Sequence, residues 1–183
     1  MDDQSFQRIR PDGDEHERLT CTRCGFIAYE NPKIIAGAVV EAEGGVLLCR
    51  RAIEPRSGFW TLPAGYMELG ETVEEAARRE AWEEARVRIA LDGVLALYSI
   101  ARIGQVQVLF RARLAEPGWG AGPESLEVRP FAWADIPWGE LAFPSVRWAL
   151  RHWHATRGQP LSAPATNPPE DARGTTPLEG SAI

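Results

Sequence analysis

The stretch from 72 to 85, TVEEAARREAWEEA, constrains this chain more than any other. Thr72-Val73-Glu74-Glu75 has the form of a capping box, which predicts a helix that begins there and runs to about Ala85. At about 100° per residue, Glu80 and Glu84 lie roughly 40° apart on one side of that helix. The same side carries only small or apolar neighbours, namely Val73, Ala76, Ala77 and Ala81. The helix therefore carries two carboxylates on the face that a globular protein normally buries.

Mutual repulsion makes this arrangement costly, because Glu83 lies at the edge of the same face. Two unit charges 4 Å apart cost about 4 kcal/mol at an effective dielectric near 20, and a domain is stable by only about 5–15 kcal/mol. A solvated helix face is the usual explanation of a Glu-rich stretch, but solvated charges do not need a face of alanines. A divalent cation removes the conflict, and oxygen ligands favour Mg²⁺, Mn²⁺ or Ca²⁺ over zinc. The pattern therefore predicts a metal site.

The remaining elements predict a mixed α/β chain. Residues 34–51 read as two β-branched runs joined by a turn at Glu43-Gly44-Gly45. Residues 88–100 and 106–114 read as two further strands, and the second alternates apolar and polar residues as a half-buried strand does. A short strand near 128–133 and a closing helix over 145–156 complete the series.

Composition bounds the kind of protein and its partners. The chain of 183 residues has a net charge of −6 and no apolar run approaching the ~20 residues that cross a bilayer. Its first residues are charged and unlike a signal peptide. An acidic chain also lacks the basic stripe that nucleic-acid binding usually requires. We expect a soluble, cytoplasmic protein whose partner is a small molecule, neither nucleic acid nor a membrane.

Three regions follow from the shifts in composition. Residues 1–33 form a polar N-terminal extension with one CxxC, made by Cys21 and Cys24. Residues 34–157 form the main domain, within which Cys49 reads as a buried strand residue. Residues 158–183 hold five prolines and no aromatic residue, so we expect a disordered, Pro-rich tail. The odd number of cysteines gives no disulfide framework.

The carboxylate helix also belongs to a longer spaced pattern. Gly65 is followed after five residues by Glu71, and after seven more by Arg79-Glu80-Ala81-Trp82-Glu83-Glu84. This spacing resembles the Nudix box, the signature of a family of Mg²⁺-dependent diphosphate hydrolases. One position departs, because Arg86 stands where the family usually has glycine. A glycine there suits a left-handed helix end, so Arg86 predicts a changed helix exit that leaves the metal ligands intact.

The resemblance implies roles for the matching residues. Glu80 and Glu84 would be the principal ligands of Mg²⁺ (or Mn²⁺), and Glu83 a further ligand or a base. The Gly65 carbonyl would also face the metal, while Glu71 and Arg79 would orient helix and loop through an ion pair. The implied fold is an α/β/α sandwich around a mixed sheet, with a short ribbon-like segment at the N-terminus.

Diphosphate cleavage needs a base and positive charge as well as a metal. In many family members the base comes from a loop well beyond the box, and GWGAGPESLEV is the matching segment. Glu124 is the first candidate and Glu127 the second; an exposed loop position is the alternative for Glu124. Arg51 and Arg56 are candidates for binding the phosphates, although a surface role suits each equally well.

An aromatic pair follows these arginines. Phe59 and Trp60 could stack on a base, although such a pair leaving a strand is more often part of a core.

Further motifs lie outside the box, namely NPKIIAGAVV, LLCRRAIEPRSGFWTLPAGYMELGET, the GQ at 104–105, GPESLE and LAFPSV. With them the chain, over roughly residues 14–150, resembles one branch of the family. Its members act on FAD or ADP-ribose and carry a small zinc ribbon before the Nudix domain. The ribbon usually has two CxxC pairs, and only Cys21 and Cys24 are present here. Zinc takes four ligands, so His16 or a second chain in a homodimer would have to contribute; a metal-free remnant is the preferred interpretation.

Together these features predict a Mg²⁺-dependent pyrophosphatase that splits FAD or ADP-ribose and releases AMP. Hydrolysis of nucleoside triphosphates at the same metal site is the alternative within the same class. A non-catalytic, nucleotide-sensing domain is the alternative outside it, but such domains are expected to lose box carboxylates and none is missing here.

Overall fold

The computed structural model describes residues 5–177, and the chain divides into two compact units, Met1–Pro32 and Lys33–Ile183. No helix within 5–177 has both the length and the apolar character needed to cross a membrane. The elements are β1 (Phe6–Ile9), β2 (Arg18–Cys21), β3 (Ile27–Ala28), β4 (Lys33–Ala42), β5 (Gly45–Arg51), β6 (Trp60–Thr61), β7 (Ala64–Tyr66), α1 (Val73–Ala85), β8 (Ile89–Ile100), η2 (Ala101–Ile103), β9 (Gln105–Leu114), β10 (Ser125–Phe131), η3 (Trp133–Asp135), η4 (Trp138–Glu140), α2 (Pro144–Thr156) and η5 (Pro169–Asp171).

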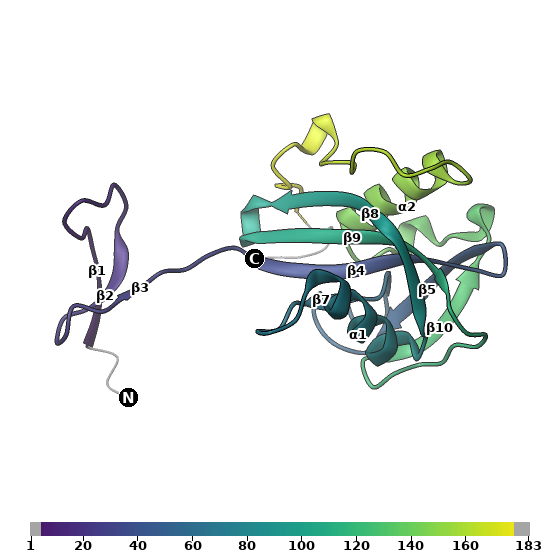
Figure 1. The fold of residues 1–183 in the computed structure, drawn as a ribbon, viewed down its shortest axis with the longest axis horizontal. Helices are drawn as coiled ribbons and strands as arrows, with labels where there is room; N and C mark the ends of the chain where they lie inside the picture. Colours follow the sequence, from purple (N-terminus) through teal and green to yellow (C-terminus); the bar gives the residue numbers. More distant parts are fainter. Residues whose placement is uncertain (1–4, 178–183) are drawn as a thin grey trace. The chain divides into compact units, whose positions relative to one another are not determined.

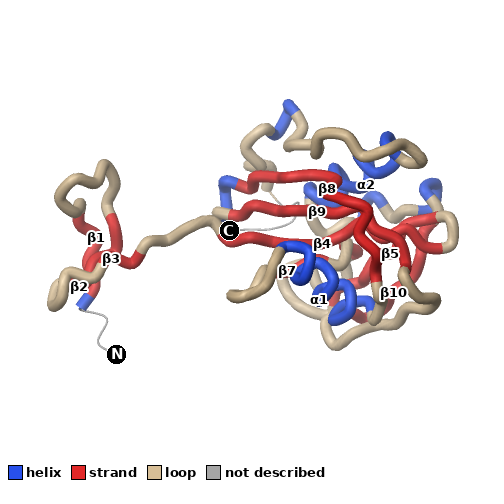
Figure 2. The backbone as a smooth tube through the Cα atoms, in the orientation of Figure 1, coloured by secondary structure: helices blue, strands red, loops and turns tan. Residues whose placement is uncertain are grey.

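The smaller unit is a three-stranded antiparallel sheet in the order β1-β2-β3 (Figure 2). The CxxC lies in the turn after β2, where the Gly25 amide donates to the Cys21 carbonyl at 2.9 Å. Gly25 has a φ of 73°, which favours glycine at this position of the turn. The ribbon-like segment expected from the sequence is therefore present as a small sheet.

The larger unit holds a mixed sheet of seven strands in the described part of the chain (Figure 1). Its main order is β10-β5-β4-β9-β8, with β6 paired to β5 and β7 paired to β4. β4 and β9 run parallel, whereas the other neighbours in this order are antiparallel. Apolar alternation along β4 and β9 is what gives the sheet two buried faces.

One helix covers each of these faces. Ala36, Ala38 and Val40 of β4 pack in one core with the alanines of α1, whereas Val39 packs in the other with Leu150 of α2. Alanines on α1 let the helix approach the sheet closely, and full burial of a side chain such as Leu150 stabilises the fold by about 1.5–3 kcal/mol. The predicted α/β/α sandwich is confirmed.

The β4–β5 hairpin separates soon after its turn, and this separation prepares the site. Glu43 and Gly44 form the turn with φ values of 47° and 77°, as a two-residue hairpin requires. β4 then pairs with β7 and β5 with β6. A Cβ on Gly37 would lie 2.3 Å from the Ala64 side chain. The glycine thus lets the segment before the carboxylate helix lie directly on β4.

The structure corrects the expectation of a disordered tail for residues 158–177. Ala165 pairs with β8, since the Leu97 amide donates to its carbonyl at 2.8 Å and its own amide donates to the Leu95 carbonyl at 2.9 Å. Asp171 is buried in the turn that follows. Composition misled here because an edge strand offers backbone partners that require no apolar side chain. The remainder of the tail, 178–183, lies outside the described residues.

Candidate active site

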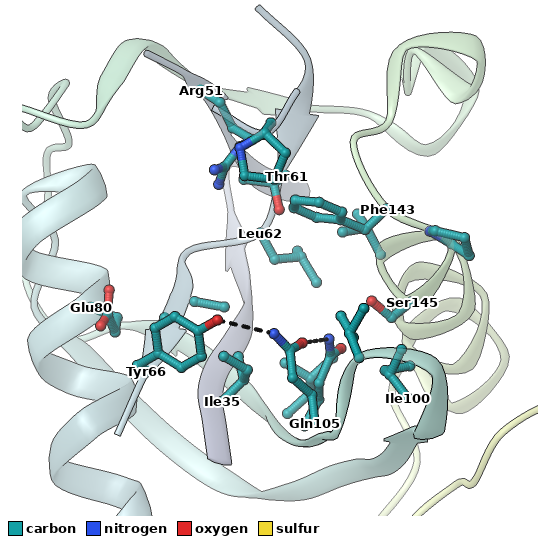
Figure 3. A pocket seen from close by; sticks show the side chains of 18 of the residues that line it. Ile35, Arg51, Thr61, Leu62, Tyr66, Glu80, Ile100, Gln105, Phe143 and Ser145 are labelled. Carbon is teal, nitrogen blue, oxygen red and sulfur yellow. Dashed lines mark hydrogen bonds between the residues drawn. The ribbon is translucent and has the colours of Figure 1, made fainter. Parts of the chain in front are cut away.

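A cleft of about 700 Å³ lies between α1 and the α2 side of the sheet (Figure 3). This volume is within the usual range for small-molecule sites, about 300–1,000 Å³. Glu80, Glu83 and Glu84 of α1 line it, and so do residues of β4, β7 and β9. The carboxylates are therefore part of a ligand-sized cavity.

The helix that carries them begins and turns as the sequence predicts. Thr72 accepts a hydrogen bond from the Glu75 amide, and the Glu75 carboxylate accepts one from the Thr72 amide. Glu80 and Glu84 are 9% and 6% exposed, whereas Glu83 lies at the solvated edge. Two carboxylates thus sit on the buried side of α1.

Arg79 is the centre of the hydrogen-bond network. Its guanidinium forms a two-point pair with Glu71, at 2.8 Å and 3.1 Å, which is the ion pair that the resemblance implies. It also donates to Glu80 at 2.7 Å, to Glu83 at 3.0 Å and to the Tyr66 carbonyl at 2.9 Å. One side chain therefore ties the loop before α1 to two of the helix carboxylates.

Of the two buried carboxyl groups, Glu80 and Glu84, Glu84 has the more strongly raised pKa. Burial raises the pKa of its carboxyl to about 8, and the charges of Glu80 and Glu124 act in the same direction. The Ala64 amide, which donates to Glu84 Oε2 at 3.1 Å, and the charge of Arg51 oppose this rise. The ionised form that a metal needs is thus held at an electrostatic cost.

Glu80 lies against the backbone of β7. Burial raises its pKa, with Arg79 opposing and the charges of Glu83 and Glu124 adding to the rise. A Cβ on Gly65 would lie 2.3 Å from Glu80 Oε1. Any side chain at position 65 would therefore displace this carboxylate.

The donor set fits a Mg²⁺-type cation that is shared with a substrate. No three His, Cys, Asp or Glu side chains within residues 5–177 form a ready-made metal cluster. Mg²⁺ typically uses one or two carboxylates and completes its shell with water and substrate phosphates. Glu80 and Glu84 supply two carboxylates whose raised pKa values a bound cation would reverse.

The exit of α1 differs from the sequence prediction. Arg86 adopts the left-handed conformation, with a φ of 53°, that glycine would adopt there. Its amide donates to the Trp82 carbonyl at 3.0 Å and that of Val87 to the Ala81 carbonyl at 3.3 Å. These bonds offset the cost of about 1 kcal/mol for a residue with a Cβ. The helix exit is thus retained and not changed.

A loop returns to this end of α1 and brings the candidate base with it. The amides of Gly120 and Gly122 donate to the carbonyls of Ala85 and Glu84 at 2.9 Å and 3.0 Å. A Cβ on Gly122 would lie 1.6 Å from the Glu83 carbonyl oxygen, so no other residue fits. Two residues later Glu124 lines the cleft.

Comparison with known proteins agrees with this geometry. The model described as NUDIX domain matches residues 31–152, and the model described as Nudix N-terminal matches residues 4–30. The chain belongs to the Nudix family.

Named relatives match shorter stretches. A MutT-like protein of Streptomyces ambofaciens is 36% identical over 99 residues, which are 54% of this chain and 60% of that protein. An ADP-ribose pyrophosphatase of Methanocaldococcus jannaschii is 37% identical over 71 residues, 39% of this chain and 42% of that one. The matches thus span 60% or less of these relatives.

Solved structures match over more of the chain. The crystal structure of a Nudix hydrolase from Nitrosomonas europaea has a TM-score of 0.83 and 43% identity, and the match covers 88% of this chain and 93% of that one. An ADP-ribose pyrophosphatase from Streptococcus suis has a TM-score of 0.61 at 20% identity, covering 75% and 100%. The second match supports the Nudix fold alone.

Of the second candidate base, Glu127, and the two candidate phosphate-binding arginines, Arg51 and Arg56, only Arg51 lines the cleft. Glu127 pairs with Arg129 at 3.2 Å and does not line the cleft, unlike Glu124. Arg51 lines the cleft, with its guanidinium 5.2 Å from the centre of the Phe143 ring. Arg56 does not line it and donates to the Ala142 carbonyl at 3.3 Å. Of the two predicted arginines, only Arg51 therefore borders the cleft.

The aromatic pair and Cys49 are structural. Phe59 lies under the Arg56 guanidinium, 4.4 Å from it, and does not line the cleft. Trp60 is buried in the core, the alternative that the sequence favoured for the pair. Cys49 is buried in β5, as expected, and burial raises the pKa of its thiol. The cleft gives no support for Phe59 as a base-stacking residue.

Sequence reasoning missed a polar row inside the cleft. Gln105 donates to the Tyr66 hydroxyl at 3.2 Å, and Gln107 donates to Gln105 at 3.4 Å (Figure 3). Both glutamines belong to β9, which the sequence indicated only as a half-buried strand, without a role for its polar positions. The sequence did contain a signal for this row. Gln105 and Gln107 lie on the same face of the strand as Leu109, which is buried, so this face does not simply point to solvent.

The N-terminal cysteines do not make a complete zinc site. Backbone amides of Arg23 and Cys24 hold the pKa of the Cys21 thiol below its usual value. Zinc takes four ligands in structural sites, whereas residues 5–177 contain no group of three or more metal-binding side chains, and His16 completes none. The described residues therefore do not fit zinc within one chain.

Gly65→Ala tests the contact between β7 and Glu80. The new Cβ would push the Glu80 carboxylate away, so we expect Mg²⁺ affinity, measured by titration calorimetry, to fall at least about tenfold. Gly139→Ala is the matched control, because a Cβ at that exposed position meets no atom within 4 Å. Unchanged affinity in Gly65→Ala would contradict the role of Gly65 and Glu80 in metal binding.

The buried Glu84 carboxyl predicts a pH-dependent stability without metal. Its pKa is raised from an ordinary value near 4.3 to about 8, so its contribution to stability is present at low pH and is lost as pH rises through 8. Between pH 5.5 and 8.5 in EDTA, we expect the parent to lose roughly 2–5 kcal/mol relative to Glu84→Gln in urea unfolding. Equal slopes for the two proteins would refute the desolvation of Glu84.

Proposed function

We propose that this chain is a Mg²⁺-dependent pyrophosphatase that hydrolyses the diphosphate of a nucleoside diphosphate linked to a second moiety, ADP-ribose or FAD, and releases AMP. The observation that carries the proposal is the pair of desolvated carboxylates, Glu80 and Glu84, on the wall of a cleft of about 700 Å³. Such a pair is costly unless a cation and phosphates complete it.

Glu80 and Glu84 would be the principal ligands of Mg²⁺ or Mn²⁺, with the Gly65 carbonyl and Glu83 as further oxygens. When bound, the cation would neutralise phosphate oxygens and make a bound water more acidic. Arg79 would keep Glu80 and Glu83 oriented through the hydrogen bonds described above. The pair of Arg79 with Glu71 would hold the loop that carries Gly65.

Glu124 would take the proton of the attacking water. It borders the cleft close enough for its charge to raise the pKa values of Glu80 and Glu84. It is also exposed, so it can return the proton to solvent. Arg51 would supply a cation to the phosphoryl oxygens, because it lines the cleft near enough for its charge to lower the pKa of Glu84. Its Nε donates to the Pro55 carbonyl at 2.9 Å, and it forms no ion pair with a carboxylate within residues 5–177.

The rest of the cleft suits a nucleotide. Tyr66, Gln105 and Gln107 offer hydroxyl and amide groups that can bond a base or a ribose. Trp148 adds an aromatic surface. The ADP-ribose pyrophosphatase of Methanocaldococcus jannaschii, 37% identical over its matched segment, supports ADP-ribose as a substrate, while FAD rests on the resemblance of the wider sequence.

The test is AMP release from ADP-ribose, FAD, NADH and ATP, each with Mg²⁺ and with EDTA. We expect metal-dependent AMP from ADP-ribose or FAD, reduced at least about 100-fold in Glu84→Gln because a first ligand matters at least as much as its supporting groups. Pyrophosphate from ATP alone would favour a triphosphate hydrolase. A protein that binds Mg²⁺ but cleaves none of the four would favour a sensing domain.

Glu124→Gln tests the base separately from the metal. Loss of general-base catalysis lowers kcat by about 10²–10⁴-fold, and we expect Mg²⁺ affinity to change much less, since Gln keeps the loop contact made by the main-chain carbonyl of residue 124 with the Ala52 amide. Glu127→Gln is the matched control and should keep the parent kcat. A Glu124→Gln protein with parental kcat would remove Glu124 from the mechanism.

A further inference from the structure

The segment 165–176 lies outside the stretch that matches the Nudix domain, 31–152, yet it reaches the cleft. In Figure 1 it follows α2, coloured yellow-green to yellow, and runs along β8. Asp171, Gly174 and Thr176 are among the residues that line the cavity. The cleft is therefore built in part by residues that the family pattern does not include.

The first half of this segment is fixed to β8 by paired hydrogen bonds. Ala165 exchanges backbone bonds with Leu95 and Leu97 at 2.9 Å and 2.8 Å. The Asn167 side chain binds both backbone groups of Ser99, accepting from its amide and donating to its carbonyl, each at 2.8 Å. Asn167 also donates to the Asp171 carbonyl at 3.1 Å. One amide side chain thus connects the edge strand to the turn that follows.

The second half is held by Asp171 and by close backbone contact. The Asp171 carboxylate accepts from the amides of Thr175 and Thr176 at 2.6 Å and 3.1 Å. The Ala101 amide donates to the Arg173 carbonyl at 2.9 Å. A Cβ on Gly174, whose φ is 60°, would lie 2.4 Å from the Ser99 carbonyl oxygen. The segment therefore lies directly against the end of β8, which completes this side of the cavity.

This wall stands away from the metal site. Gly174 abuts Ile100, and Figure 3 shows Ile100 on the opposite side of the cleft from Glu80. Arg102 and Ile103 of η2 also line this end. Within residues 5–177 the Arg102 side chain forms no hydrogen bond or ion pair, whereas the Asp171 oxygens accept hydrogen bonds from backbone amides. The end of the cleft thus offers apolar surface and one free guanidinium.

From this arrangement we infer that residues 165–176 form a specificity wall, which binds the moiety of the substrate farthest from the carboxylates. The inference rests on the proposed function, because the diphosphate must lie at Glu80 and Glu84 for the far moiety to reach Ile100. A base or sugar bearing hydroxyl or anionic groups fits the apolar surface and Arg102. Contacts this far from the reacting phosphorus stabilise ground state and transition state alike, so they lower KM and leave kcat nearly unchanged.

Truncation is the direct test. A chain that ends at residue 160 lacks the wall, and a matched chain that ends at residue 177 keeps it. For ADP-ribose we expect the shorter chain to raise KM at least about tenfold with kcat within about threefold of the parent. The 1–177 chain should keep both constants. Parental KM in a folded 1–160 chain, shown by an unchanged Mg²⁺-induced rise in Tm, overturns the inference.

A point variant tests the same inference if the truncated chain fails to fold. Asn167→Ala removes the bonds to Ser99 and Asp171 without touching the cleft, so KM for ADP-ribose should rise by about threefold or more while kcat holds. Ser162→Ala, an exposed position before the wall that does not line the cleft, should match the parent. A parental KM in Asn167→Ala would also overturn the inference, whatever its kcat.

Binding separates this inference from the proposed function. If the parent cleaves none of the four substrates, the proposed function fails, and the dissociation constant of ADP-ribose with Mg²⁺ is measured by calorimetry instead. A weaker constant in 1–160 and in Asn167→Ala than in the parent supports the wall independently of hydrolysis. Equal constants in all three proteins, or no binding by the parent, overturn it.

Discussion

The guanidinium of Arg79 is the interaction on which the rest of the site depends. It binds Glu71 at two points and also reaches Glu80, Glu83 and the Tyr66 carbonyl. Charge-assisted pairs of this fork geometry are roughly twice as strong as neutral hydrogen bonds and define an orientation. A lysine carries the same charge but lacks the planar fork of donors that binds three carboxylates and a carbonyl here. One planar cation thus keeps a group of like charges in a fixed arrangement.

The chemistry of the site was more predictable than its shape. Helical period and the capping box placed Glu80 and Glu84 on the buried face of α1, because both signals are local in the sequence. The two glutamines of β9 were not singled out from the sequence, because alternation identifies the two faces of a strand but not which face borders a cavity. That distinction depends on α2 and on the tail, which are distant in sequence.

The errors have a common physical origin. The tail was expected to be disordered because composition measures apolar burial, whereas Ala165 and Asn167 are held by polar groups of β8. Arg86 was expected to change the end of α1, but the carbonyls that await partners there impose a left-handed residue whatever its side chain. In both places the backbone of a neighbouring element decided the outcome, and side-chain patterns carry little information about it.

The loop with Gly120 and Gly122 donates to the last carbonyls of the helix that bears Glu84. Main-chain hydrogen bonds therefore fix the loop that carries Glu124 to the end of α1. The distance between Glu124 and the carboxylates of α1 is set by these bonds and does not require a bound substrate. In the proposed mechanism, mutations at the β8 end of the cavity would therefore alter which nucleotide is accepted, while Glu80, Glu84 and Glu124 keep their positions. A chain built in this way would be able to change substrate at one wall of the cavity while the groups proposed for the chemistry stay in place.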